Sequence, residues 1–415
     1  MGRLLLRGGC VLTLGAKTAN HPQADVLIEE DRIVEIGPGL RARDAEVLDA
    51  SNSIIMPGFV DTHRHTTTAL FRNSAAAATS SLSPEDVYAA TLIGLLGALE
   101  SGTTTICDWA DDLDRAEPAL QAHLDAGVRT VYVSPFKAGG RVDVGELAAR
   151  SGGRISVAAG SPDVSRDNAS KLEEIWTGAR TLGLRIHAHA GLDPADAGIV
   201  SELGRKGVLG GDVTLVHGTH LSDEDLDTVA ARGASLAVAP SSEMAGVLGA
   251  PPLQKFLDRN IQPGLAVDDE RLSPPDMLAQ MRMANSLQHA AYFDLKLAGK
   301  AGLPNLLTTR DVIRYATMEG AKTLGLGSVT GSLEAGKQAD IVVFRTDKPN
   351  IYPINDPIGA VVWGVDRSNV ETVIVAGRVR VSEGRVDADI ATVRSLVEAA
   401  HRRLTPTSGL TGVGT

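Results

Sequence analysis

Residues 58–332 alternate short apolar runs with helical stretches about eight times, and this alternation constrains the fold more than any other feature of the chain. The strand candidates are GFVDTHRH, TTTICDW, RTVYVSPF, RISVAAGSP, LRIHAHA, DVTLVHG, ASLAVAP and QPGLAVDD. Repeated strand–helix units favour a closed (β/α)8 TIM barrel over an open, doubly wound sheet. No glycine-rich phosphate loop follows the first strand, so a dinucleotide site has little support.

Several helices between these strands carry clear start and stop signals. Ser83-Pro84-Glu85-Asp86 supplies an N-cap, a proline in the first turn and an acid behind it, and Ser222-Asp223-Glu224-Asp225 reads as a capping box. Gly127, Gly183 and Gly233 stand where C-terminal caps of helices are expected.

Both ends of the chain are rich in strands instead. Residues 1–57 consist of short runs, either apolar or alternating between apolar and polar residues, that are separated by Gly, Pro and Asp. The same pattern occurs over residues 333–390. An isolated sheet at either end would leave open edges, so we expect one small β domain built from both ends. Residues 391–415 are expected to form a C-terminal helix and a flexible tail.

The charge and the cysteine content limit the classes of partner. The net charge of −11 argues against nucleic acid and against an anionic membrane surface, because both require a basic face. No run approaches the ~18 apolar residues of a transmembrane helix. The N-terminus lacks a cleavage site typical of a signal peptide, and Cys10 and Cys107 stand far apart, so a cytoplasmic protein without a disulfide framework is expected.

Histidines are paired at the ends of three strand candidates. Of the ten histidines, six form the pairs His63/His65, His187/His189 and His217/His220, each at the carboxyl end of a strand, where barrel active sites are built. Residues two apart on a strand share a face, so His63 and His65 can bind one ion together. Asp268 ends the last strand candidate, and imidazole with carboxylate suits one Zn2+, with Fe2+ or Mn2+ as alternatives.

Spacing alone does not decide between His187 and His189, which share a face. The position of His189 nearer the strand end favours it as the ligand, with His187 buried one layer below. His220 follows its strand and is expected to be structural or to face the substrate. The unpaired histidines are expected at the surface: His21, His123, His289 and His401.

These motifs resemble those of the amidohydrolase superfamily. PGFVDTHRH, GTTT, HAH, LVHGTHLSDEDL and GLAVDD stand in the order of the first, second, fifth, sixth and eighth strands, and GSLEAGKQADIVVF resembles the return to the family's β-sandwich. The resemblance covers nearly the whole chain and is closest to the branch of cytosine deaminases and triazine hydrolases. It implies a β-sandwich from residues 1–57 and 333–390, a single metal without a carbamylated lysine, and a homodimer.

The resemblance also implies roles for individual residues. His63, His65 and His189 would be metal ligands, and Asp268 would be both ligand and base. His217 would stand near the reacting water and polarise the substrate. Elementary chemistry agrees, because a divalent cation lowers the pKa of a bound water towards ~7, an adjacent carboxylate can take its proton, and a histidine can stabilise developing charge.

One position departs from the family pattern. Deaminases of this branch carry a proton-shuttling glutamate three residues after the fifth-strand ligand, and that position is Leu192. Asp193 could replace it, although an N-cap role before Pro194 is preferred. Glu243 could supply the acid or bind substrate from the seventh strand, with a solvated loop carboxylate as the equal alternative. Arg72 is a further candidate for substrate binding, with a structural role equally plausible.

The sequence therefore predicts a metal-dependent hydrolase of C–N bonds in a small, cyclic, nitrogen-containing compound. Deamination or dechlorination of an N-heterocycle is the alternative within the enzyme class, and the leucine at position 192 favours amide or ring hydrolysis. An inactive homologue that only binds metal or ligand is the alternative from another class. Retention of all four expected ligands and of His217 argues against it.

Overall fold

The computed structural model describes residues 2–74, 82–110, 116–136 and 149–404. Eight parallel strands form one sheet in chain order, and each of the eight strand candidates contains one of them. They are β6 (Phe59–Arg64), β7 (Thr103–Trp109), β8 (Arg129–Pro135), β9 (Ile155–Gly160), β10 (Ile186–Ala190), β11 (Val213–His217), β12 (Ser235–Val238) and β13 (Gly264–Leu265).

The first and last of these strands meet and close the sheet. The backbone N–H of Asp268 donates to the carbonyl of His63 at 2.9 Å, and the N–H of His65 donates to the carbonyl of Asp268 at 3.0 Å. This pairing confirms the predicted barrel and places the ends of β6 and β13 side by side. Gly58 permits the neighbouring contact with β7, because a Cβ at that position would collide with the Thr104 side chain.

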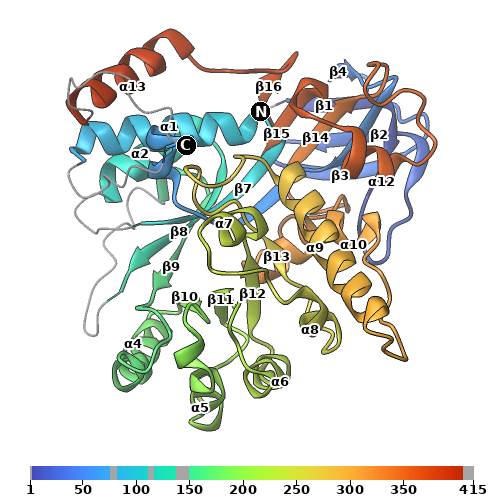
Figure 1. The fold of residues 1–415 in the computed structure, drawn as a ribbon. Coiled ribbons are helices and arrows are strands. Elements are labelled where there is room, and N and C mark those ends of the chain that lie inside the picture. Colours follow the sequence, from blue (N-terminus) through green and yellow to red (C-terminus); the bar gives the residue numbers. More distant parts are fainter. Residues whose placement is uncertain (1, 75–81, 111–115, 137–148, 405–415) are drawn as a thin grey trace.

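Helices surround the barrel, as Figure 1 shows for α4, α5 and α6 outside β10 to β12. The predicted capping boxes of Ser83 and Ser222 open α1 and α6, and all three predicted cap glycines have positive φ. The helices are α1 (Pro84–Leu99), α2 (Ala116–Ala126), α4 (Ala169–Thr181), α5 (Ile199–Arg205), α6 (Asp223–Arg232), α7 (Pro240–Ala245), α8 (Leu253–Leu257), α9 (Met277–Leu297), α10 (Thr309–Tyr315) and α11 (Met318–Thr323), with short turns η1 (Thr66–Phe71) and η3 (Pro194–Asp196).

A second, mixed sheet combines both chain ends, as predicted. In Figure 1 its blue N-terminal and red C-terminal strands lie together beside the barrel. The strand β5 lies between β1, its parallel partner, and β14, its antiparallel partner, with Ile55 opposite Val343. Its strands are β1 (Arg3–Val11), β2 (His21–Glu29), β3 (Arg32–Gly37), β4 (Ala45–Asp49), β5 (Ser53–Pro57), β14 (Ile341–Arg345), β15 (Val370–Val375), β16 (Arg378–Ser382) and β17 (Arg385–Val386).

The chain continues from this sheet into a helix that returns to the barrel. After the short elements α12 (Pro357–Gly359), η4 (Ala360–Gly364) and η5 (Arg367–Asn369), α13 (Ile390–Leu404) packs on α1, where Ala400 is buried and Arg403 pairs with Asp86. The predicted flexible tail, residues 405–415, lies outside the described residues. Among the helices of the described chain, none has the length and hydropathy needed to cross a bilayer.

Candidate metal centre

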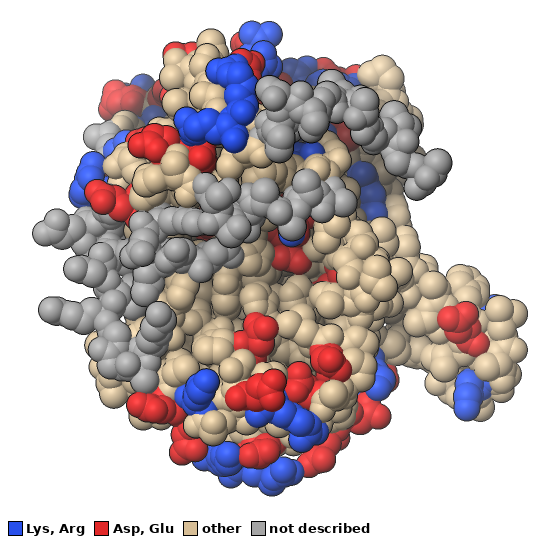
Figure 2. Space-filling model, turned by 60° about the vertical axis from the view of Figure 1, so that its left-hand side comes forward, with Lys and Arg blue, Asp and Glu red and all other residues tan. Residues whose placement is uncertain are grey.

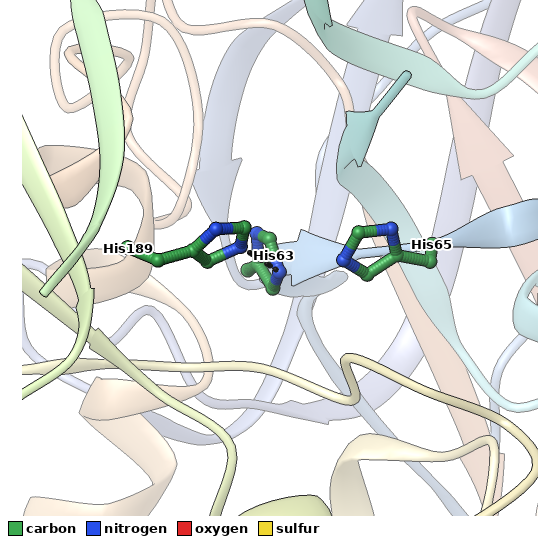
Figure 3. A group of neighbouring side chains, drawn as sticks. All are labelled: His63, His65 and His189. Carbon is green, nitrogen blue, oxygen red and sulfur yellow. Dashed lines mark hydrogen bonds between the residues drawn. The ribbon is translucent and has the colours of Figure 1, made fainter. Parts of the chain in front are cut away.

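Three histidines from two strands converge at the carboxyl end of the barrel. His63 and His65 come from the end of β6, and His189 comes from β10 on the opposite side. Figure 3 shows the ring of His63 between the other two, and one ring nitrogen from each lies within 4.8 Å of the others. His63 Nε2 is 3.4 Å from His189 Nε2. His189, not His187, is therefore the member of its pair that joins this group.

Asp268 completes the group from the closing edge of the barrel. Its Oδ1 lies 3.4 Å from His63 Nε2 and 3.7 Å from His65 Nε2. Its Oδ2 accepts a hydrogen bond of 2.7 Å from Ser242 Oγ. The backbone of Asp268 has a φ of 63°, a left-handed conformation that a non-glycine residue adopts at a cost and that is held here by the pairing with β6.

The spacing and the chemistry of these four side chains fit a divalent cation. Ligands 2.0–2.1 Å from a tetrahedral zinc ion lie roughly 3.3 Å apart, close to the separations of the donor atoms here. Nε2 of His63 lies 3.4 Å from Nε2 of His189 and 3.4 Å from Oδ1 of Asp268, so electron pairs of all three atoms can point to one position. An ion at that point would satisfy all of them, so His63, His65, His189 and Asp268 are the residues that could hold it.

The electrostatics favour the protonation states that bind metal. Burial lowers the pKa of His63 well below its ordinary value and also lowers that of His189. Burial raises the pKa of Asp268, but its hydrogen bond with His63 and the charges of the neighbouring histidines outweigh this, so the net pKa is lowered. Neutral imidazoles beside an ionised carboxylate are the forms that donate electron pairs to a cation.

Asp163 supports the group from outside, and the sequence analysis did not identify it. Its Oδ1 lies 3.1 Å from Nδ1 of His189, on the side of the ring opposite to His63. A carboxylate in this place fixes the tautomer and orientation of a ligating histidine. Asp163 follows the end of β9, so the rule that barrel sites use strand ends was the available signal. Trp109, at the end of β7, was also missed, and its ring lies 4.3 Å from that of His189.

His217 joins the cluster from the end of β11. Its ring lies 5.5 Å from that of His189 and 5.9 Å from that of His63. Its Nδ1 is 3.1 Å from Oε1 of Glu243, a carboxylate on α7 that is completely buried. Glu243 is therefore not a solvated loop residue. Burial lowers the pKa of His217, but the hydrogen bond with Glu243 and the charge of Asp268 raise it more.

Asp193 does not take the place of the glutamate that was expected at Leu192. After β10 the chain turns at Gly191, whose φ is 65°. The side chain of Asp193 accepts a hydrogen bond from the N–H of Ala195 at 2.8 Å and caps η3, which is the role preferred from the sequence. The position therefore lacks a group that could move protons beside the histidines.

A cavity of about 360 Å3 opens over the group. Its described lining combines site residues with a more apolar wall and an ion pair: His65, Thr68, His217, Ser242, Gly246, Leu248, Asp268, Asp269, Arg271 and Leu272. Drug-sized ligands occupy cavities of about 300–1,000 Å3, so the volume suits a small molecule. On the face drawn in Figure 2, acidic and basic side chains are interspersed around a hollow.

The other predicted substrate contacts lie outside this lining. Arg72 pairs with the buried carboxylate of Glu270, and His220 donates its backbone N–H to Gly191 at 3.0 Å. Glu243 reaches the cavity only through His217. The substrate-binding roles of Arg72, His220 and Glu243 therefore stay predictions.

Two histidines away from the group are buried. His187 lies below His189 as predicted, with its Nδ1 3.7 Å from Sγ of Cys107, and both cysteines are free thiols. The prediction that His123 lies at the surface is wrong. The ring of His123 is completely buried between Asp108, at 2.7 Å, and Thr130, at 2.9 Å, because α2 packs this face onto the strands.

Comparison with known proteins gives the same assignment as these motifs. The sequence model of the amidohydrolase family matches residues 54–380. The chain is 30% identical to the 5-methylthioadenosine/S-adenosylhomocysteine deaminase of Desulforudis audaxviator, over 97% of this chain and 99% of that protein. It is 28% identical to the 5'-deoxyadenosine deaminase of Methanosarcina mazei, over 93% of this chain and 94% of that protein.

Solved structures share the fold at lower identity. An adenosine deaminase from Xanthomonas campestris with bound zinc has a TM-score of 0.81 and 22% identity, with 97% of this chain and 98% of that chain covered. The atrazine chlorohydrolase TrzN from Arthrobacter aurescens TC1, complexed with zinc, also has a TM-score of 0.81 and 22% identity, with 96% and 100% covered.

The match to the family model spans most of the chain and includes every strand that carries a histidine of the group. The relatives named above are enzymes and align over nearly their whole lengths. This favours an enzyme over a homologue that only binds ligand. We conclude that the chain belongs to the amidohydrolase family, as a metal-dependent hydrolase.

Proposed function

We propose that the protein hydrolyses a C–N bond of a small nitrogen heterocycle and that one zinc ion per chain is its cofactor. The observation that carries this proposal is the convergence of His63, His65 and His189 beside a cavity of about 360 Å3, with Oδ1 of Asp268 3.4 Å from His63 and 3.7 Å from His65. A cation bound there would lower the pKa of a water molecule towards ~7 and so supply a nucleophile at neutral pH.

Asp268 and His217 would supply the proton transfer and the stabilisation of charge that the reaction also needs. Oδ1 of Asp268 faces the histidines, and Oδ2 accepts a hydrogen bond from Ser242. Oδ2 is therefore the oxygen that can accept a proton from water and return it to the leaving nitrogen. His217 lines the cavity and can polarise the atom that gains negative charge in the tetrahedral intermediate.

Removal of an exocyclic amino group is the form of this reaction that the relatives support, since the curated relatives named above are deaminases of adenosine derivatives. The test is ammonia release by the zinc-loaded protein from adenosine, 5'-deoxyadenosine, 5-methylthioadenosine and S-adenosylhomocysteine. We expect at least one to be turned over. Asp268→Asn, which keeps a side chain of the same shape, should abolish turnover, and equal activity of this variant would refute the proposal.

Leu192 favours a second candidate, the hydrolysis of a cyclic or side-chain amide. Protonation of a purine ring nitrogen needs an acid that this position does not supply, whereas an amide can be cleaved with Asp268 and His217 alone. Dihydropyrimidines, lactams and an amino- or chlorotriazine belong in the same panel. Cleavage of the amides without ammonia release from the purines would select this candidate. The homodimer and the cytoplasmic location expected from the sequence stay predictions.

A further inference from the structure

We infer that Glu243 is a positioning residue for His217: it keeps a hydrogen on Nδ1 of that ring and so directs Nε2, which carries the second hydrogen when the ring is protonated, to the cavity. The two side chains meet at 3.1 Å between Oε1 and Nδ1. Burial raises the pKa of Glu243 above its ordinary value, and the hydrogen bond with His217 opposes this shift. Oε1 also accepts the N–H of Ala239, so this oxygen is the acceptor in both contacts, and the hydrogen between the two side chains is assigned to Nδ1. The inference rests on the proposed function only for its effect on catalysis.

Glu243 is held rigidly enough to impose this orientation. It lies on α7, directly after β12, and its side chain is completely buried. The same Oε1 accepts a hydrogen bond of 2.9 Å from the N–H of Ala239. The backbone carbonyl of Glu243 accepts a hydrogen bond of 2.9 Å from the N–H of Leu248. The hydrogen bond from Ala239 therefore holds the carboxylate, and the hydrogen bond from Leu248 holds the backbone of the same residue.

His217 in turn needs an external partner. It ends β11 with a φ of 74°, so it has left the regular strand conformation that would otherwise set the direction of its side chain. Non-glycine residues persist in this region when their surroundings determine them, and such residues are frequent at functional sites. The hydrogen bond from Nδ1 to Glu243 is the interaction that determines the ring here.

Glu243 does not replace the acid that is missing at position 192. Its carboxylate faces the imidazole of His217 and is absent from the described lining of the cavity. Adjacent residues of α7 thus divide two tasks, because Ser242 contacts Asp268 and Glu243 contacts His217. The substrate would meet Nε2 of His217, and Glu243 would act only through it.

The test compares the zinc-loaded wild type with Glu243→Gln and Glu243→Leu. Gln keeps an oxygen that can accept from Nδ1, whereas Leu removes the acceptor, and the exposed Glu224→Gln is the matched control. Nitrogen-15 spectra of histidine-labelled protein report which ring nitrogen carries hydrogen, and His217→Asn identifies the signals. Zinc content and melting temperature establish that each variant is folded and loaded.

We expect Nδ1 of His217 to carry hydrogen in the wild type, in Glu243→Gln and in the control, and this preference to disappear in Glu243→Leu. An unprotonated Nδ1 in the wild type, or an unchanged spectrum in Glu243→Leu, would overturn the inference. On any substrate of the panel, kcat of Glu243→Leu should fall about 10²-fold, with KM changed far less and partial rescue in Glu243→Gln. Should the wild type turn over no substrate, the proposed function fails while the spectra still decide the role of Glu243.

Discussion

Asp163 and His189 form a hydrogen-bonded pair across two neighbouring strands, with Oδ1 and Nδ1 3.1 Å apart, while Nε2 of the same ring faces His63. We predict that Asp163→Asn lowers zinc affinity about 10- to 100-fold, because the carboxylate fixes the ring and raises its basicity. Competition with a chromophoric chelator measures this. The control is Asp167→Asn, an exposed residue of the same loop, which should bind zinc like the wild type. Equal affinity of both variants would contradict the role of Asp163.

Ser242 donates to the oxygen of Asp268 that does not face the histidines. Without that hydroxyl, Oδ2 loses its donor and the carboxylate can rotate. We predict that Ser242→Ala lowers kcat about 10-fold, within the range of hydrogen bonds to charged groups, and that zinc content is unchanged. Steady-state kinetics on the first active substrate measure it. Ser241→Ala, the buried neighbour, is the control, and a larger loss there would show that α7 is merely sensitive to substitution.

Asp225 stabilises the outer helices of the barrel. Its buried carboxylate accepts from the N–H groups of Gly198 and Ser201 at 2.7 and 2.8 Å, and from the hydroxyl of Ser222 at 2.7 Å. Asp225→Ala leaves these donors unpaired, so we predict a loss of about 2–4 kcal/mol in the free energy of unfolding. Thermal unfolding measures it, with the exposed Asp227→Ala expected to change stability by less than about 1 kcal/mol.

The same carboxyl gives a pH dependence. Burial raises the pKa of Asp225, but the hydrogen bonds from Gly198, Ser201 and Ser222 lower it more, and the net pKa lies below its ordinary value. Its stabilising contribution is therefore complete above the unfolded pKa of about 4 and is lost as the pH falls through the folded pKa. The difference in melting temperature between wild type and Asp225→Asn should shrink from pH 6 to pH 3, and a difference that grows would refute this assignment.

Arg64 lies between His63 and His65 in the sequence and is completely buried in an ion pair network. It donates to Glu270 at 2.8 Å and to Asp61 at 3.1 Å. Arg64→Met would leave the buried carboxylate of Asp61 without its arginine and Glu270 with Arg72 alone, so we predict a loss of about 3–5 kcal/mol in the free energy of unfolding. The exposed pair of Arg205 and Glu224 provides the control, because Arg205→Met should cost less than about 1 kcal/mol. Comparable losses in both variants would contradict the prediction.

The barrel, and the meeting of His63, His65 and His189 at one end of it, could be predicted because their signals are local. The strands are short apolar runs, several of which have polar residues at the carboxyl end, and barrel topology brings all these ends to one face. The spacing of His63 and His65 then suffices to place both on one side of β6. Even β13, only two residues long as a strand, was identified, since the Asp268 that follows it marks its end.

Long-range hydrogen bonds could not be predicted in the same way. The partner of Glu243 is a residue of another strand, and no local pattern distinguishes a carboxylate that turns inward to His217 from one in solvent. His123 illustrates the same limit, since it stands alone in the sequence and is buried because Asp108 and Thr130 meet it in space. Hydrogen bonds between side chains of different elements depend on how the helices pack against the barrel, and no local sequence pattern encodes this packing.

The position of β5 between β1 and β14 has a consequence for biosynthesis. One edge of this apolar strand, Ser53–Pro57, has no partner until the ribosome has delivered Ile341–Arg345 and with it the whole barrel. At 5–20 residues per second this interval is on the order of tens of seconds. Throughout it the nascent chain carries an unpaired edge that can join another chain. Aggregation during synthesis is therefore the hazard that this topology creates, and chaperone occupancy of the first sixty residues would be its signature.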